Sequence, residues 1–144
     1  MMLFTPKKAK FTKQQKGRAF NKINKDLALN QLKYGCIGLK ALEPGRISST
    51  QLLALRQTLN KHIKKKGRIF LNIFPHTPIT KKPIKVRMGK GKGSVDHHVA
   101  KIQPGLLLCE IETASFSLAK KALILVQNKL PIKTKLVFEA NLIS

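Results

Sequence analysis

Apolar residues recur along the chain with two different spacings, and these predict both helices and strands. After Ser48, leucine and isoleucine recur every three or four positions, which places them on one face of a helix. Ser48 and Gln51 match a capping box, in which each side chain satisfies a free backbone N–H at the helix start. The buried face predicted for this helix consists of Leu52, Leu55, Leu59 and Ile63.

The end of the first helix and the whole of a second one are also predicted. Lys64, Lys65 and Lys66 are expected in the last turn of the first helix, where positive charge interacts favourably with the helix dipole. Gly67 is expected as its C-cap. A second helix is predicted over residues 115–129, and its buried stripe consists of Ala119, Ala122, Leu123, Val126 and Leu130.

Shorter apolar runs bounded by turn residues predict strands. The predicted strands cover residues 36–42, 68–74, 95–102, 106–111 and 133–139. The third and fourth are expected to form a hairpin around Gln103-Pro104-Gly105. Between residues 75 and 94 prolines and glycines break the pattern, which predicts a long basic loop. The resulting order of elements predicts an α+β fold, with two helices packed on a mostly antiparallel sheet.

Charge changes this picture from a generic domain to a binding protein. The 144 residues contain 29 Lys and Arg but only 6 Asp and Glu, a net charge of +23. Of these, 23 basic and 2 acidic residues lie in the first 95 positions. Such a surface favours a polyanion, most commonly nucleic acid, with an anionic membrane surface as the rival. No apolar run approaches the roughly 18 residues of a membrane span, so none is expected.

The N-terminal segment 1–34 is expected to be an extended basic arm, and residues 35–144 a single domain. Lysines recur in this segment without helical or strand periodicity. Phe4, Phe11 and Phe20 are interleaved with them, which favours an arm that lies on RNA over a solvated tail. A mitochondrial presequence is a further alternative, although such segments favour Arg and Ser over Lys.

Enzyme, cofactor and metal sites are not expected. The segment Met88–Ser94 alternates Gly and Lys, but it lacks the Gly-Lys-Ser/Thr of a phosphate-binding loop, and a strand is predicted after it. His97 and His98 are adjacent on a predicted strand, so they point to opposite faces and do not readily share a metal. Cys36 and Cys109 are isolated, and the acids form no convincing acid–base pair.

Four segments resemble a known family. They are Lys16-Gly17-Arg18, Gly38-Leu39-Lys40-Ala41, the stretch from Phe74-Pro75 to Val86-Arg-Met-Gly-Lys-Gly-Lys-Gly93, and Lys129-Leu-Pro-Ile-Lys-Thr134. Together they resemble the large-subunit ribosomal protein L-sixteen family of bacteria and organelles, over about residues 3–139. The sequence departs from the family's pattern at His97-His98, at Cys109 and in a longer segment 19–34.

The resemblance implies a compact hammerhead-like fold and a structural role in the large ribosomal subunit during translation, including subunit assembly. The implied partners are large-subunit rRNA, tRNA and neighbouring ribosomal proteins, and no homo-oligomer is expected. The implied rRNA-binding residues are Lys7, Lys8, Lys10, Lys13, Lys16, Arg18, Lys64, Lys65, Lys66 and Arg68. The implied tRNA-proximal residues are Lys81, Lys82, Arg87, Met88, Gly89, Lys90, Gly91, Lys92 and Gly93.

Composition suggests where such a ribosome is found. Lysine outnumbers arginine 24 to 5, and Asn, Ile and Leu are abundant, as an AT-rich genome produces. With a family-like start near residue 3, we expect an organelle-encoded protein of the mitochondrial matrix ribosome. A plastid or the cytoplasm of an AT-rich bacterium is the alternative. A free basic nucleic-acid chaperone or tRNA-binding factor is the rival to a ribosomal role.

Overall fold

The computed structural model describes residues 4–17, 31–64 and 66–138. Within these ranges the chain forms two helices and seven strands. In chain order they are β1 (Ile37–Ala41), β2 (Gly45–Ser48), α2 (Ser49–Ile63), β3 (Gly67–Leu71), β4 (Thr77–Lys81), β5 (Ser94–Ile102), β6 (Leu107–Thr113), α3 (Phe116–Gln127) and β7 (Thr134–Phe138). The predicted α+β class is confirmed, but the strands form two separate antiparallel sheets rather than one.

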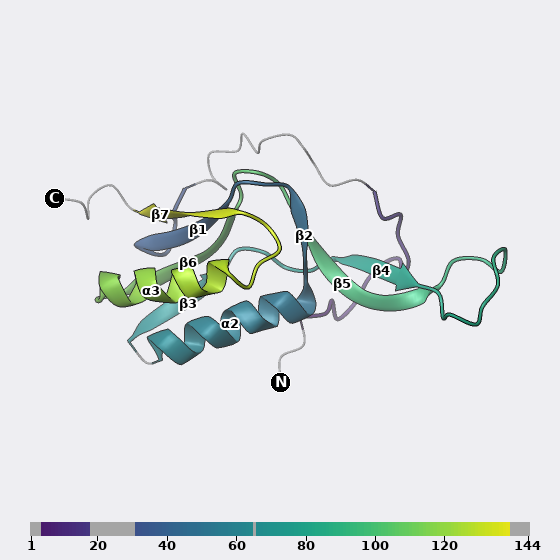
Figure 1. Ribbon diagram of the computed structural model, residues 1–144, viewed down its shortest axis with the longest axis horizontal. Helices are drawn as coiled ribbons and strands as arrows, with labels where there is room; N and C mark the ends of the chain where they lie inside the picture. Colours follow the sequence, from purple (N-terminus) through teal and green to yellow (C-terminus); the bar gives the residue numbers. More distant parts are fainter. Residues whose placement is uncertain (1–3, 18–30, 65, 139–144) are drawn as a thin grey trace.

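The first sheet contains four strands in the order β3-β6-β1-β7, and every neighbouring pair is antiparallel. Helices α2 and α3 pack against each other and cover one face of this sheet (Figure 1). The two central strands, β1 and β6, are almost entirely buried. Burial of this apolar surface is the main stabilising contribution, at roughly 25 cal/mol per Å².

Helix α2 begins as predicted. The Ser48 hydroxyl accepts a hydrogen bond from the Gln51 N–H at 3.2 Å, and the Gln51 side-chain oxygen accepts one from the Ser48 N–H at 2.9 Å. The capping box is therefore present. The four apolar residues predicted for its inner face are all fully buried. Local spacing was sufficient here because capping and helical periodicity both depend on near neighbours in the sequence.

The predicted end of this helix is wrong. Helix α2 ends at Ile63, so Lys64 and Lys66 follow the helix instead of lying in its last turn. Lys64, with φ 51°, is the C-cap of this helix, the role predicted for Gly67. Gly67 is instead the first residue of β3, where an added Cβ would lie only 2.4 Å from the Glu112 carbonyl oxygen. Glycine is required there for close strand approach rather than as a C-cap.

The second sheet contains three antiparallel strands in the order β2-β5-β4. Strand β2 was not predicted, because its four residues Gly-Arg-Ile-Ser offer a single buried apolar position, Ile47. Such a short strand shows no alternation that could be recognised in the sequence. Its position between β1 and α2 places Arg46 on the second sheet, where it contacts the arm.

The predicted hairpin of residues 95–102 and 106–111 is also wrong. Strands β5 and β6 lie in different sheets, and the turn between them carries the chain from one sheet to the other. The Gly105 N–H donates to the Ala41 carbonyl at 2.8 Å, and the Ala41 N–H donates to the Leu106 carbonyl at 2.9 Å. The turn thus packs on the end of β1, and β6 continues between β1 and β3. The turn residues were recognised correctly, but they do not specify which strands pair.

The predicted loop of residues 75–94 is shorter than expected. Strand β4 occupies Thr77–Lys81 and pairs with β5 at the edge of the second sheet. Pro78 is tolerated in this strand because an edge strand does not need every backbone N–H for pairing. The segment without regular structure is therefore residues 82–93, and it projects beyond the rest of the chain (Figure 1). Strand β3 is shorter too, because it ends at Leu71 instead of residue 74.

The C-terminal elements match their predictions within two residues at each end. Helix α3 covers Phe116–Gln127, and β7 covers Thr134–Phe138. Four of the five residues predicted for the helix stripe are buried in α3, namely Ala119, Ala122, Leu123 and Val126. Leu130 lies beyond the helix end and is half-buried. These elements complete the apolar layer and leave the basic residues of the arm and loop outside it.

Candidate nucleic-acid interface

The described part of the arm, residues 4–17, forms no helix or strand and lies along the second sheet (Figure 1). Its five lysines are exposed: Lys7, Lys8, Lys10, Lys13 and Lys16. The ion pairs within the described ranges are Asp96–His97 and Glu43–Lys133, so neither of them involves these lysines. The five positive charges are therefore available to phosphates. Arg18 lies outside the described residues.

Polar contacts hold the end of the arm on the second sheet. The Arg46 guanidinium on β2 donates to the Gly17 carbonyl at 2.6 Å and to the Lys16 carbonyl at 3.5 Å. Gly17 has φ +61°, a left-handed conformation that suits glycine. Arg46 was not among the predicted site residues, because its partners are about thirty positions away and no local pattern connects them.

A reciprocal pair of contacts joins the arm to the loop. The Lys13 ammonium donates to the Lys92 carbonyl at 3.0 Å, and the Lys92 ammonium donates to the Gln14 carbonyl. These bonds use backbone acceptors, so they neutralise neither lysine. The predicted rRNA-binding arm and the predicted tRNA-proximal loop are thus brought together as one continuous basic surface.

The phenylalanines of the arm differ in how far they are buried. Phe4 packs against the apolar core and lies under the Arg56 guanidinium, 6.0 Å from its ring centroid. Phe4 is half-buried, so part of this ring is used in packing on the protein itself, and its contact with RNA stays a prediction. Phe11 remains 62% exposed, which leaves it accessible to RNA. Phe20 lies outside the described residues.

The loop of residues 82–93 presents basic and apolar side chains together. Arg87, Lys90 and Lys92 are exposed, and Lys82 is half-buried, whereas Lys81 belongs to β4. Met88 is 94% exposed at the tip. Gly89 and Gly91 have φ of +97° and +72° and stand in open space, so they serve the turns of the backbone rather than close packing. Strand β5 follows the loop, so its Gly-Lys alternation lacks the helix that a phosphate-binding loop requires.

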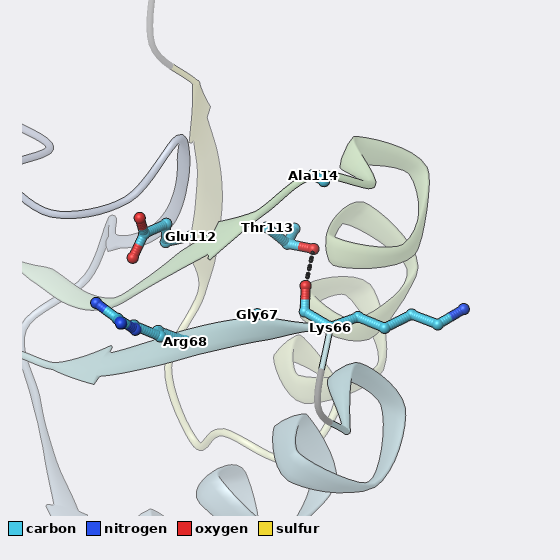
Figure 2. Close-up of a pocket in the computed structure, with 6 residues that line it drawn as sticks. All are labelled: Lys66, Gly67, Arg68, Glu112, Thr113 and Ala114. Atoms are coloured by element: carbon cyan, nitrogen blue, oxygen red, sulfur yellow. Dashed lines mark hydrogen bonds between the residues drawn. The ribbon is translucent and has the colours of Figure 1, made fainter.

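The cluster predicted from Lys64 to Arg68 lies elsewhere. It follows the C-terminal end of α2, at the far end of the long axis from the loop (Figure 1). Figure 2 shows the Lys66 side chain extending away from Arg68, while the Thr113 hydroxyl donates to the Lys66 carbonyl at 2.8 Å. The structure therefore does not bring this cluster together with the arm. Lys65 lies outside the described residues.

A buried acid fixes the segment that leads from the arm into the first sheet. One carboxylate oxygen of Glu110 accepts hydrogen bonds from the N–H groups of Lys33, Tyr34 and Gly35, at 2.9, 2.7 and 3.0 Å. The other accepts one from the Asn72 amide at 2.7 Å. Burial raises the pKa of Glu110, but these four hydrogen bonds outweigh burial and lower the pKa below its ordinary value.

This anchor was missed by sequence reasoning, although a signal existed. Glu110 stands inside an apolar run of a chain that has very few acids. A charged residue there is expected to be buried and therefore satisfied by hydrogen bonds. Its partners could not be identified from sequence, because three of them are backbone groups more than seventy positions away.

The histidines and cysteines form no reactive centre in the described ranges. His97 contacts Asp96 at 2.9 Å, while His98 lies on the other side of β5 beside the arm. Burial, with a smaller effect of neighbouring Glu110, raises the pKa of Cys109 to about 12, so its thiol stays protonated. No group of three or more possible ligands among His, Cys, Asp and Glu gathers for a metal within these ranges. Nor does either described helix have the length and apolar character to cross a membrane.

The sequence is similar to a family of known proteins over most of its length. The family described as Ribosomal protein L16p/L10e matches residues 6–137. The large ribosomal subunit protein uL16 of Cereibacter sphaeroides is 44% identical over 135 residues, which cover 94% of this chain and 96% of that protein. The uL16 protein of Wigglesworthia glossinidia brevipalpis is 46% identical over 136 residues, with the same coverage. The matches extend over almost the whole chain and confirm the resemblance seen in its motifs, so the chain belongs to the ribosomal protein L16p/L10e family.

Proposed function

We propose that this chain is a structural, non-enzymatic constituent of the large ribosomal subunit and that it binds rRNA. The relatives named above are large-subunit proteins, and the family is a structural component of the ribosome rather than an enzyme. The observation that carries the proposal is the continuous basic surface made by the arm and the loop, which are joined through Lys13 and Lys92. An rRNA backbone supplies the phosphates that such a surface needs.

The arm and the Lys64–Arg68 cluster are proposed to contact different parts of the rRNA. The cluster lies at the far end of the long axis from the loop that the arm contacts (Figure 1). Lysine contacts to phosphates hold a protein in position without reading sequence, so binding follows the shape of the folded RNA. A protein that binds at two separated places can fix the relative position of two RNA segments, which is consistent with a role in subunit assembly. Neighbouring ribosomal proteins are its other proposed partners.

The loop of residues 82–93 is proposed to reach toward tRNA bound to the ribosome. Its projection from the second sheet and its flexible glycines support this role (Figure 1). The Arg87 guanidinium has a planar fork of donors that suits phosphate oxygens. The expected contributors are Lys82, Arg87, Met88, Lys90 and Lys92, together with Lys81 at the end of β4.

For its location we propose the ribosome of a mitochondrion, on the strength of the excess of lysine over arginine. The relatives named above are bacterial, so they support the alternative, a bacterial ribosome. Fractionation of the source cells separates the two locations. Recovery of the protein with organelle ribosomes supports the mitochondrial proposal, and recovery with the cytoplasmic ribosomes of a bacterium contradicts it.

Sucrose-gradient fractionation tests the ribosomal role. A native extract is washed in high salt, separated, and followed by mass spectrometry of the protein. We expect one copy per large subunit after the wash, because contacts distributed over two RNA segments dissociate slowly. A protein found only in the soluble fractions, with large subunits complete without it, would instead indicate a free nucleic-acid chaperone.

A further inference from the structure

We propose that the cleft between the arm and the second sheet binds one unpaired base of the large-subunit rRNA. This inference rests on the proposed function and names the part of the RNA that this surface recognises. The cleft has a volume of about 310 Å³. It is lined on one side by the arm, including Lys7 and Phe11, and on the other by His76, Pro78, Val95 and His98.

The size of the cleft suits one flat ligand. Sites for small molecules occupy roughly 300 to 1,000 Å³, so this cleft lies at the lower end of that range. The arm lines one side, and His76 with strands β4 and β5 lines the other. A single planar base fits a cleft of this volume, whereas a folded peptide or a duplex is larger than it.

The walls of the cleft have the chemistry that holds unpaired bases. Phe11 offers a largely exposed ring, with the Lys10 ammonium 5.6 Å from its centroid. On the sheet side, His76 lies against the Phe74 ring with centroids 4.9 Å apart, and His98 adds a second imidazole. Buried Pro78 contributes an apolar surface. Bases extruded from RNA are held by stacking between such aromatic and apolar side chains.

Charge around the cleft favours a ligand that carries phosphate. Strand β5 has an irregularity opposite Ile79 and Thr80, and beyond it Val95 and His98 both line the cleft. Asp96 is turned away, because its carboxylate contacts His97 at 2.9 Å and lines a different hollow. No carboxylate thus belongs to the described lining, whereas the Lys7 side chain does. A base in the cleft leaves its phosphate beside the lysines of the arm.

The walls are held in place before any RNA arrives. The Arg46 guanidinium contacts the arm at Gly17, and Lys13 contacts the Lys92 carbonyl, so the arm is anchored on the C-terminal side of Phe11. Phe4 anchors the other end by packing against the core. A preformed cleft binds more tightly than one that must be ordered on binding.

Tryptophan fluorescence tests the cleft directly. The chain has no tryptophan, so Phe11→Trp introduces a single reporter into the full-length protein. A single-stranded oligoadenylate of six nucleotides is the probe, and a duplex with the same number of phosphates is its control. We expect the single strand to quench the fluorescence of the introduced indole saturably, because a base stacks on it. The duplex is expected to bind through its phosphates without this quenching, since its bases are already stacked.

Two further variants test the opposite wall of the cleft and the position of the reporter. In the Phe11→Trp background, His98→Ala is expected to weaken the fluorescence-detected affinity roughly ten-fold, the effect of losing a stacking wall. Phe116→Trp places the reporter on α3, outside the cleft, and should show no quenching. RNA binding itself is followed separately by the anisotropy of labelled RNA.

The outcomes separate this inference from the proposed function. Single-strand binding without quenching, or equal quenching by the duplex, overturns the base-binding cleft and leaves phosphate binding by the arm intact. Absence of binding by either RNA contradicts both proposals.

The source of the base is tested in assembled large subunits. Subunits free of tRNA are prepared with the Phe11→Ala protein and treated with a reagent that acylates the 2′-hydroxyl of mobile nucleotides. One unpaired rRNA nucleotide is expected to become more reactive than in the wild type. Lys120→Ala, an exposed residue of α3 outside the cleft lining, should leave it unchanged. A change that appears only with tRNA bound, or no change at all, overturns the assignment to rRNA.

Discussion

The first sheet with its helices and the arm on the second sheet are held by different forces. The first sheet and its helices are held by buried leucines and isoleucines, many of them fully buried. The arm is held largely by hydrogen bonds from lysine and arginine to backbone carbonyls. This contrast indicates that the first region maintains the fold, whereas the arm displays positive charge that a polyanion such as RNA neutralises. Damage to each region should therefore appear in a different measurement.

The largest expected effect on stability comes from the first region. Leu55→Ala removes a fully buried side chain of α2 and leaves a cavity, which costs about 2 to 5 kcal/mol of unfolding free energy. Urea unfolding measures this loss. Leu125→Ala, at a 43% exposed position of α3, is the matched control and should change stability by roughly 0.5 kcal/mol at most. Similar losses for both leucines would contradict the placement of the core.

Glu110→Gln is expected to have the next largest effect. The glutamine amide has one acceptor oxygen where the carboxylate has two. Its NH2 group, a donor, must therefore face either the three backbone N–H groups or the Asn72 amide N–H, which are donors too. The expected loss is about 1 to 3 kcal/mol in urea unfolding. Glu112→Gln, on the exposed part of β6, is the control and should behave like the wild type.

The same acid predicts a pH dependence. The folded protein lowers the pKa of Glu110 below its ordinary value of 4.5, so the unfolded chain takes up this proton first. The stabilisation is therefore fully present above pH 4.5 and is lost as the pH falls through the lower pKa of the folded state. Unfolding measured from pH 7 to pH 3 should show a smaller decrease in stability for Glu110→Gln. Identical curves would show that Glu110 does not titrate in this way.

A smaller effect is expected where the arm is attached. Arg46→Ala removes the hydrogen bonds to the Gly17 and Lys16 carbonyls, which contribute about 1 kcal/mol or less. Limited proteolysis within residues 4–17 should become faster while the first sheet stays resistant. Arg68→Ala, at an exposed position of β3, is the control. Faster cleavage throughout the protein would show that the two regions are not separable.

Arg87→Ala should have almost no effect on stability, because the side chain is exposed in the loop. It is expected to slow the accommodation of aminoacyl-tRNA more than it impairs subunit assembly. Arg87→Lys keeps the charge but loses the planar fork, so its accommodation rate should lie between the rates of the wild type and Arg87→Ala. Rapid kinetics on intact ribosomes measure the effect, and wild-type rates for Arg87→Ala would contradict the proposed role of the loop.

Sequence predicted this protein best where structure depends on near neighbours. Helix α2 was predicted from a capping box and a leucine spacing, both of which act within a few residues. The hairpin after β5 was predicted wrongly, because Pro104 and Gly105 specify a turn but not the sheet that the next strand joins. Strand β4 was hidden by its proline, which is acceptable only because the strand lies at an edge.

The candidate site was predicted in the same uneven way. Lysine-rich segments identified the basic surface, since charge is visible in composition. The contacts that assemble this surface could not be predicted, because Lys13 and Lys92 are 79 positions apart in the sequence and Arg46 and Gly17 are 29 positions apart. The cleft beside Phe11 likewise exists only where the arm and two strands come together.

The most direct test of the division between scaffold and RNA-binding surface removes the same number of positive charges from the arm or from the C-terminal third of the chain. One variant replaces five arm lysines with glutamine: Lys7, Lys8, Lys10, Lys13 and Lys16. The matched variant replaces five lysines of the C-terminal third: Lys120, Lys121, Lys129, Lys133 and Lys135. Each lysine that contacts a phosphate contributes roughly 0.7 to 0.9 to the slope of log affinity against log salt.

Large subunits assembled with each variant are washed in increasing salt, and the retained protein is measured. We expect the arm variant to be released at a much lower salt concentration than the wild type, and the matched variant to be retained like the wild type. Equal retention of both variants, or earlier release of the matched variant, would contradict the assignment of RNA binding to the arm.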